Sequence, residues 1–412
     1  MFLTAAYLCR MQNSLDVIII GGGAAGFFTA IQIAEHHPNK RILILERGKE
    51  VLTKVKISGG GRCNVTHAEF IPQELVKNYP RGERELLGPF HQFMTGDTIE
   101  WFEKQGVELK IEEDGRMFPV SDSSQTIIDC FIKKTQDFGI EVKTLESVKN
   151  FFKKEGLWNV KTKSATYQAE KLVIATGSNP KIWKHLQELN HHIASPVPSL
   201  FTFNTKDERV QGLAGISTYA SVKVVGEKLE SEGPLLITHW GFSGPGILKL
   251  SAWGAQKLFE KNYQFQLEIN WLGHASAEAT LEKLLKLKKQ NPKQQIGTYA
   301  QLNLPKRLWQ QLVAASIPEN RMWAEVSTQE LKNLCEELTQ GVYHIQGKST
   351  FKEEFVTAGG VELKEINFKT MESKLQKNLF FAGEVTNIDA ITGGFNFQNA
   401  WTSAFIAARA IS

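Results

Sequence analysis

The sequence predicts an α/β fold: a Rossmann-like domain with a parallel sheet, interrupted by an inserted β-barrel and a small helical module. Apolar runs of strand length at residues 15–20 and 171–177 are typical of parallel strands that are buried on both faces. Alternating strands separated by turn residues fill much of residues 197–270, which favours a barrel or a sandwich. A buried strand, a turn and an apolar helix follow near the C-terminus, so the α/β pattern resumes there.

A glycine-rich turn with the G-x-G-x-x-G pattern follows the first predicted strand and comprises Gly21, Gly22, Gly23, Ala24, Ala25 and Gly26. It opens a predicted helix, and Glu46 stands 20 residues after Gly26, at the end of the next predicted strand. Gly21 permits the turn, Gly23 lets the backbone approach a pyrophosphate, and Gly26 lets helix and strand pack closely. An acid at position 46 would accept hydrogen bonds from an adenosine ribose and disfavours a 2′-phosphate. The pattern therefore predicts FAD or NAD, and not NADP.

The loop at residues 54–64 (KVKISGGGRCN) holds three cations and three consecutive glycines. Successive glycine N–H groups can form an anion-binding nest, and Lys56 or Arg62 can neutralise a phosphate or a reduced flavin. A solvated, mobile loop is the alternative. Cys63 is either a redox-active thiol with a lowered pKa or, as we favour, a small residue that fills space beside the cofactor.

Two glycine motifs near the C-terminus extend the candidate site. A buried strand that ends at Gly383 and Glu384 is suited to present a carboxylate to a ribityl hydroxyl group. Gly393 and Gly394 let N–H groups at a helix start approach a ring system, where the helix dipole stabilises negative charge on a reduced flavin. The alternative is a purely structural helix that closes the sheet.

Three local patterns predict smaller elements. Asp114-Gly115 predicts a hairpin, and Ser327 with Glu330 predicts a capping box at a helix start. Short alternating runs near residues 140–148, 157–163 and 166–170 predict a small antiparallel meander.

Composition excludes several classes of protein. The chain has 412 residues, a formal net charge of +4 at pH 7 and 22% charged residues, which excludes disordered, collagen-like and coiled-coil proteins. Its mean hydropathy of −0.24 and the lack of a long apolar run predict no transmembrane span. The four cysteines are too far apart for a CxxC pair, so we expect no metal site and a cytoplasmic location. Residues 1–10 lack a basic start and a cleavage site, so we expect an extension and not a signal peptide.

The order of the motifs resembles that of two-dinucleotide-type FAD flavoproteins, which have an N-terminal GxGxxG, a central ATG (here Ala175-Thr176-Gly177) and a C-terminal GE before a helix. One branch, the bacterial BaiN-like NAD(P)/FAD-dependent oxidoreductases (aminoacetone oxidase-like proteins), is similar in further strings: SGGGRCN (58–64), GFSGPGIL (241–248), TAGGV (357–361), TMESK (370–374) and GGFNFQ (393–398). The resemblance covers residues 14–412. Ser178 departs from it, since related proteins usually have a second glycine there, and we expect only a local contact to change.

The resemblance implies an FAD domain with two inserts, and we place the boundaries from the pattern. The expected segments are 14–190 (FAD-binding domain, first part), 191–275 (β-barrel, first part), 276–339 (helical insert), 340–355 (barrel return) and 356–412 (FAD-binding domain, second part). The expected FAD-binding residues are Gly21, Gly22, Gly23, Ala24, Ala25, Gly26, Glu46, Arg47, Lys56, Ser58, Gly60, Gly61, Arg62, Cys63, Asn64, Val148, Ala175, Thr176, Gly177, Gly383, Glu384, Gly394, Phe395 and Asn396. No pattern assigns a catalytic residue.

We expect an FAD-dependent oxidoreductase that takes a hydride from NAD(P)H and reduces, or oxidises, a small organic substrate at the flavin. No second GxGxxG marks a nicotinamide site, so NAD(P)H, if it is used, binds transiently near the flavin. One alternative is a nucleic-acid-acting flavoprotein resembling the folate- and FAD-dependent tRNA methyltransferases, and another is a non-catalytic flavin-binding redox sensor.

Three observations bear on partners and on the acid or base of the reaction. The weak net charge disfavours nucleic acid as a partner. The lysine run at 283–293 is expected to form the solvent-exposed face of an amphipathic helix, and we expect no membrane partner. His239 is either an acid–base group near the flavin or, as we favour, a structural histidine.

Overall fold

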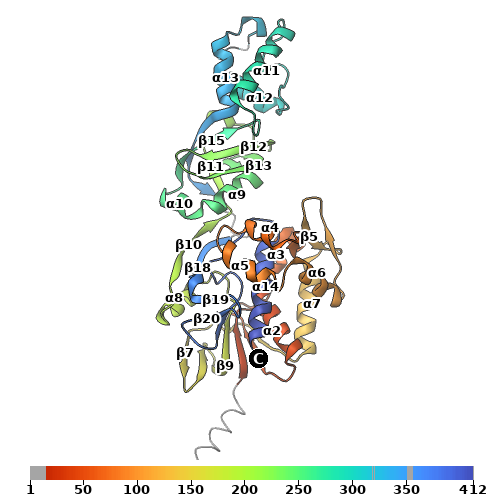
Figure 1. Cartoon of the computed structure of the whole chain (residues 1–412), viewed down its shortest axis with the longest axis vertical. Coiled ribbons are helices and arrows are strands. Elements are labelled where there is room, and N and C mark those ends of the chain that lie inside the picture. The colour runs from red at the N-terminus through yellow and green to blue at the C-terminus, as the bar shows by residue number, and fades with distance from the viewer. Residues whose placement is uncertain (1–14, 318, 320, 350–355, 412) are drawn as a thin grey trace, which may run out of the picture. The chain divides into compact units, whose positions relative to one another are not determined.

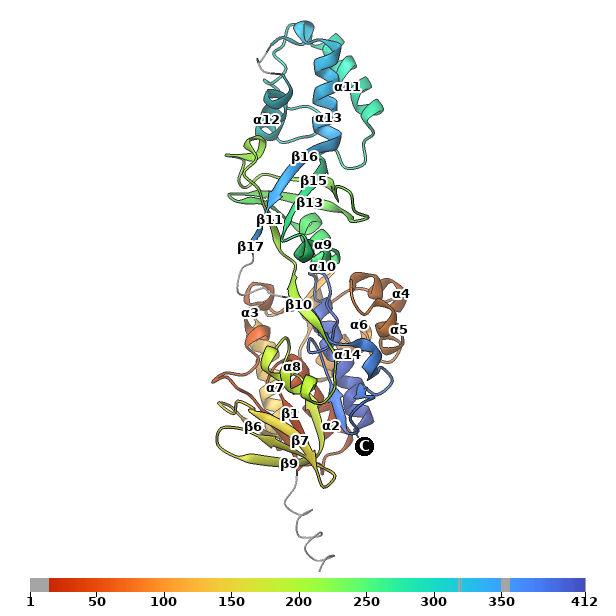
Figure 2. The same ribbon diagram turned by 90° about the vertical axis from the view of Figure 1, so that its left-hand side faces the viewer.

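The computed structural model describes residues 15–317, 319, 321–349 and 356–411. The chain forms two compact units (Figures 1 and 2). The Rossmann unit comprises the chain up to Pro196 and from Thr357 onward, and the inserted unit comprises residues 197–356. The expected N-terminal extension and residues 350–355 of the expected barrel return lie outside the described residues.

A nine-stranded sheet forms the centre of the Rossmann unit (Figure 1). Seven of its strands follow one another in the order β19 (Ile366–Asn367), β20 (Glu372–Ser373), β21 (Leu379–Phe381), β9 (Thr166–Ile174), β1 (Leu15–Ile20), β2 (Ile42–Leu45) and β6 (Glu141–Lys143). β1 runs parallel to both β2 and β9, and β21 runs parallel to β9. The predicted parallel sheet is thus confirmed, and the C-terminal strand belongs to the same sheet as the first strand.

The region between residues 140 and 174 corrects one prediction. β7 (Asn150–Lys154), β8 (Leu157–Lys161) and the first half of β9 pair antiparallel, as expected. β6, however, runs parallel to β2 at the edge of the main sheet, and β9 continues from the meander into the centre of that sheet. The strand expected near residues 140–148 therefore belongs to the parallel part of the sheet and not to the meander, because it pairs with β2 and not with β7 or β8.

Helices pack on this sheet and form an aromatic core. α2 (Ala24–His36) contacts α14 (Phe395–Ala410) and α7 (Ser124–Asp137). The ring of Phe28 on α2 lies 5.4 Å from Trp401 on α14 and 4.8 Å from Trp101. The other helices of this unit are α3 (Thr53–Gly61), α4 (Pro72–Leu75), α5 (Glu83–Phe90), α6 (Thr95–Lys104) and α8 (Pro180–Glu188). In the described part of the chain, no helix is both long and apolar enough to span a membrane.

Two small sheets complete the Rossmann unit. β3 (Thr66–His67), β5 (Arg116–Pro119) and β4 (Leu109–Ile111) form one of them, and the β4–β5 pair confirms the hairpin predicted at Asp114-Gly115. β10 (Ile193–Ser199) and β18 (Val356–Val361) form the other.

The inserted unit is a closed antiparallel barrel with a helical module. Its strands follow the order β16 (Gly341–Gln346), β15 (Gln264–Asn270), β12 (Ser217–Val224), β13 (Glu230–Thr238), β14 (Gly241–Ser243), β11 (Thr202–Asn204) and β17 (Lys348–Ser349). Only Gly347 separates β16 from β17, and its carbonyl oxygen accepts a hydrogen bond from the Asn204 N–H group at 2.9 Å, so the two ends of the order meet.

Five helices accompany the barrel. α9 (Pro245–Trp253) and α10 (Ala255–Glu260) pack beside it, whereas α11 (Ala277–Gln290), α12 (Lys306–Ser316) and α13 (Thr328–Gln340) lie together at one end of it (Figure 2). The capping box predicted for α13 is confirmed, because the Glu330 N–H group donates to Ser327 Oγ at 3.2 Å and the Ser327 N–H group donates to the Glu330 carboxylate at 2.8 Å.

Candidate functional site

In the turn between β1 and α2, two glycines have no room for a side chain, whereas a third has free space where a side chain would be. Gly21 has a φ of +116°, and a Cβ atom on it would lie 2.3 Å from the Ala175 carbonyl oxygen. A Cβ atom on Gly26 would lie 2.0 Å from the Gly21 carbonyl oxygen. No heavy atom lies within 4 Å of the corresponding position on Gly23, at the start of α2. The free N–H groups of this helix start therefore face a space that can admit an anion.

Glu46 lies at the carboxyl end of β2, half-buried, and its carboxylate faces this turn. Oε2 accepts the Gly22 N–H group at 2.8 Å, and Oε1 accepts the Gly48 N–H group at 2.6 Å. Each oxygen keeps a second lone pair for a ligand hydroxyl. The Glu146 N–H group donates to the Glu46 carbonyl oxygen at 2.8 Å, which brings the segment containing buried Val148 alongside, whereas Arg47 is exposed.

A second carboxylate lies beyond the carboxyl ends of the adjacent strands. Glu384, which follows β21, forms an ion pair with Lys54 at 2.6 Å, and its other oxygen accepts the Thr357 N–H group at 3.3 Å. Gly177, which follows Ala175 and Thr176 at the end of β9, lies beside this pair, since a Cβ atom on it would be 3.4 Å from Glu384 Oε2. Sequence reasoning missed Lys54, although it is the first cation of the same KVKISGGGRCN motif.

The two cations that the sequence singled out contact other carboxylates. Arg62 pairs with Glu112 at 2.5 Å and with Asp122 at 3.5 Å, and its guanidinium lies 3.9 Å from the centre of the Phe118 ring. Lys56 is exposed and lies 3.5 Å from a carboxylate oxygen of Glu50. Both side chains are therefore already balanced by acids of the same region.

The loop expected at residues 54–64 overlaps a short helix. α3 is helical up to Ile57, and the backbone departs from helical geometry at Ser58, Gly59 and Gly60. Gly60 and Gly61 have φ values of +69° and +86°, which glycine tolerates, and open space lies where their side chains would be.

Cys63 and Asn64 lie beneath this loop. Burial raises the pKa of the Cys63 thiol to about 12. This direction is opposite to that of a thiolate with a lowered pKa, because burial outweighs the hydrogen bond with Ser58. Asn64 is buried too, and its side-chain oxygen accepts the Met117 N–H group at 3.3 Å.

The start of α14 packs against β3. Gly394 caps the helix with a φ of +98°, and a Cβ atom on it would lie 2.4 Å from the Thr66 carbonyl oxygen. The ring of His67 stacks on Phe395 at 4.4 Å, and its Nδ1 donates to the Gly393 carbonyl oxygen at 3.0 Å. Sequence reasoning also missed His67, for which only its place three residues after the RCN string was a signal.

Polar contacts hold the loop that precedes α14. Asn396 closes it by accepting the Ala390 N–H group at 3.0 Å and donating to the Ala390 carbonyl oxygen at 3.1 Å. Arg81 forms a two-pronged ion pair with the fully buried Asp389. The Tyr79 hydroxyl donates to the Phe395 carbonyl oxygen at 2.6 Å. The helix start is therefore held rigidly before any ligand binds.

Two buried amide oxygens near this site lack partners. Oδ1 of Asn387 and Oδ1 of Asn399 accept no hydrogen bond from any described residue. Such an atom costs about 1–3 kcal/mol unless a ligand or water satisfies it. Together with the open space at Gly23 and the carboxylates of Glu46 and Glu384, these acceptors fit a ligand such as FAD, which combines phosphates with many N–H and O–H donors.

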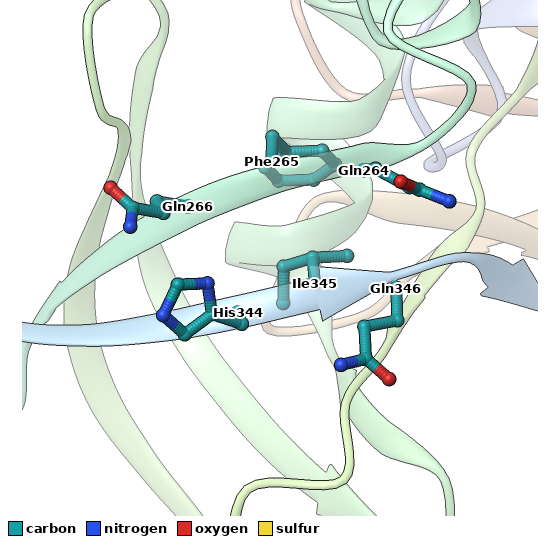
Figure 3. Close-up of a pocket in the computed structure, with 6 residues that line it drawn as sticks. All are labelled: Gln264, Phe265, Gln266, His344, Ile345 and Gln346. Atoms are coloured by element: carbon teal, nitrogen blue, oxygen red, sulfur yellow. The ribbon is translucent and has the colours of Figure 1, made fainter.

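Two shallow hollows elsewhere contain none of the predicted site residues. One, of about 330 Å³, lies on the outside of the barrel between β15 and β16, and Figure 3 shows its lining of Gln264, Phe265, Gln266, His344, Ile345 and Gln346. The other, of about 400 Å³, lies at the amino ends of β1 and β6, opposite the edge where ligands of parallel sheets bind. His239 is exposed in the turn between β13 and β14, beside Trp240.

Comparison with known proteins identifies relatives along the whole chain. The model described as "HI0933-like protein Rossmann domain" matches residues 15–410. A protein of Haemophilus influenzae named ribosomal RNA dihydrouridine synthase is 29% identical over 98% of this chain and 100% of its own length. An Escherichia coli protein of the same name is 28% identical over 97% and 98%. A 3-dehydro-bile acid delta(4,6)-reductase of Clostridium scindens is 25% identical over 95% and 98%.

Proposed function

The chain belongs to the HI0933-like family, and we propose that this FAD-dependent oxidoreductase reduces a carbon–carbon double bond conjugated to a carbonyl group. The proposal rests on one observation: the reactions named for the ribosomal RNA dihydrouridine synthases and for the bile acid reductase both concern a double bond conjugated to a carbonyl group. Dihydrouridine is uridine with its C5–C6 double bond saturated, and that bond is conjugated to the C4 carbonyl group. A 3-dehydro delta(4,6) bile acid likewise has double bonds conjugated to a ketone.

As the substrate we propose uridine in ribosomal RNA. The two relatives named for that reaction are more similar to this chain, at 29% and 28% identity, than the bile acid reductase, at 25%. A hydride added to C6 of the uracil ring and a proton added to C5 would complete the reduction. A small cyclic enone is the second candidate, because the bile acid reductase also matches along its whole length.

We assign the groups that hold FAD from the open positions of the site. The start of α2 at Gly23 would receive the pyrophosphate, Glu46 the adenosine ribose, and Glu384 a ribityl hydroxyl group, with Lys54 holding Glu384 in place. When bound, FAD supplies the two-electron carrier between NAD(P)H and the substrate. The rigid helix start at Gly394 would stabilise negative charge near the ring, because fixed backbone dipoles need no rearrangement.

The test begins with the purified protein. Its chromophore, released by denaturation, is expected to be FAD, and anaerobic addition of NADH and NADPH in turn should bleach it with at least one of them. The reduced protein is then incubated with unmodified ribosomal RNA transcripts or with a cyclic enone. We expect nucleosides heavier by two hydrogens in the RNA digest. Bleaching without turnover of either substrate would contradict the proposal and favour a redox sensor.

A further inference from the structure

The exposed face of α11 carries a row of lysines. Lys283, Lys286 and Lys289 recur every three residues and so lie along one side of the helix, and all three are exposed. Lys293 follows just beyond the helix end and is exposed as well. Within the described residues, none of these four ammonium groups forms an ion pair with a carboxylate.

The opposite side of α11 fixes this orientation. Thr280 and Leu284 are buried where the helix packs on α13. Lys288, which points to that side, donates to the Val326 carbonyl oxygen. The lysine face is therefore held outward by packing and does not depend on the lysines themselves.

Two arginines of the same module have partners. Arg321 pairs with Glu330, and Arg307 donates to the Gly212 carbonyl oxygen. The helix dipole favours cations only in the last turn of a helix, and Lys283 lies almost two turns before the end of α11. Neither local pairing nor the dipole therefore accounts for the whole row.

We propose that this lysine face binds the phosphate backbone of the RNA substrate, an inference that rests on the proposed function. Lys283 and Lys289 are about 9 Å apart along the helix axis, a span that matches two to three successive phosphates of one strand. Tyr299, six residues beyond Lys293 in the loop after α11, is 60% exposed and is an aromatic side chain on which a base can stack. The weak net charge of the whole chain does not oppose this, because binding depends on the local row of cations.

The experiment replaces all three lysines in the full-length protein, Lys283→Gln, Lys286→Gln and Lys289→Gln. Glutamine preserves the helix while removing the charge. The matched control is the triple variant Lys154→Gln, Lys161→Gln and Lys163→Gln, which removes three exposed lysines from the β7–β9 meander and gives the same net charge. Binding of polyuridylate and of ribosomal RNA transcripts is measured by fluorescence anisotropy across a salt series, and FAD content and melting temperature report on folding.

We expect the α11 variant to lose on the order of tenfold in affinity for both RNAs, and its salt dependence to fall by about two units of log K per log salt. The control should bind like the wild type. Equal affinity of the two variants would overturn the proposal. Lost binding to phosphatidylglycerol vesicles with RNA binding unchanged would overturn it in favour of a membrane surface.

Dihydrouridine formation by the wild type tests the proposed function separately. If the wild type forms no dihydrouridine, but RNA binding still depends on the α11 lysines, then the RNA-binding surface is supported and the proposed reaction is wrong. If the wild type forms dihydrouridine and both variants bind RNA equally, then the reaction stands and the surface is wrong.

Discussion

A charged cluster in the inserted unit and one in the Rossmann unit differ in how far their hydrogen-bonding capacity is used. In the inserted unit, the guanidinium of Arg209 makes five hydrogen-bond contacts. Two go to the Glu337 carboxylate at 2.7 and 2.8 Å, two to the Asp207 carboxylate at 2.6 and 2.8 Å, and one to the Val342 carbonyl oxygen at 2.5 Å. Its guanidinium also lies 3.9 Å from the centre of the Tyr343 ring. This cluster is closed, and it ties the barrel to α13.

In the Rossmann unit, two polar groups near the candidate site, Glu384 after β21 and Asn399 on α14, use only part of their hydrogen-bonding capacity. Glu384 has one cation partner, Lys54, whose side chain is 60% exposed, and Asn399 has a buried oxygen with no partner among the described residues. From this difference we expect the saturated cluster to serve stability and the partly paired groups near Glu384 to serve a ligand. Mutations that separate stability from cofactor affinity test this comparison.

The largest effect is expected for Arg209→Met. It leaves the acids of Asp207 and Glu337 unpaired, and breaking a largely buried ion cluster of this kind costs roughly 3 kcal/mol. Urea unfolding monitored by tryptophan fluorescence measures the loss, and FAD content should not change. Lys257→Met, which removes an exposed pair with Glu227, is the control and should cost under about 1 kcal/mol. A loss of FAD without loss of stability in the Arg209 variant would break the comparison.

A pair of glycine variants in one turn comes next. Gly26→Ala places a methyl group against the Gly21 carbonyl oxygen, a backbone atom that cannot move aside, and should destabilise the apoprotein by about 2–3 kcal/mol. Gly23→Ala meets open space and should cost less than about 1 kcal/mol, yet should weaken FAD binding because it fills the space for the pyrophosphate. Melting temperature and titration of the apoprotein with FAD distinguish the two. Equal behaviour would refute a division between packed and open glycines.

Glu46→Ala should mainly affect the cofactor. We expect FAD affinity to fall by roughly 1–3 kcal/mol, since a ribose hydroxyl group loses its acceptor. Glu46→Gln should lose less, because its amide oxygen still accepts the hydrogen bond of one neighbour, the Gly22 or the Gly48 N–H group. Titration of the apoproteins with FAD measures both losses, and Glu50→Ala at an exposed position is the control. Unchanged FAD affinity in the alanine variant would remove Glu46 from the site.

The smallest effect concerns a closed cluster inside the Rossmann unit. Buried His191 donates from Nδ1 to Glu365 at 3.1 Å and accepts the Ser373 hydroxyl at Nε2 at 2.9 Å. Burial lowers the pKa of His191 below its ordinary value of 6.5. The unfolded chain therefore takes up a proton that the folded chain resists, so stability is present above pH 6.5 and is lost as the pH falls below it.

Melting temperatures measured on both sides of that pH test this expectation. The wild type should melt lower on the acidic side, and His191→Gln should show a weaker pH dependence with unchanged FAD affinity. His36→Gln, at an exposed position, is the control and should behave like the wild type. An unaltered pH dependence in the His191 variant would show that other groups set the acid response of this unit.

The sequence by itself determined the elements whose cause is local. The strand–turn–helix at residues 15–36, the hairpin at Asp114-Gly115 and the capping box of Ser327 and Glu330 all depend on neighbours close in the chain. Burial on both faces gives parallel strands their apolar runs, so the Rossmann-like sheet was also predictable.

Only the tertiary structure decided which side chains meet across the fold. Lys54 reaches Glu384 across 330 positions of sequence, and His67 reaches Gly393 across 326, so no local pattern could select them over Lys56 or Arg62. The fold likewise decided between the two interpretations of Cys63, because it buries the sulfur while the neighbouring Arg62 pairs with Glu112. The sequence gives the type of each side chain, but the local dielectric and the ionic partners of that side chain depend on which residues surround it in the folded protein.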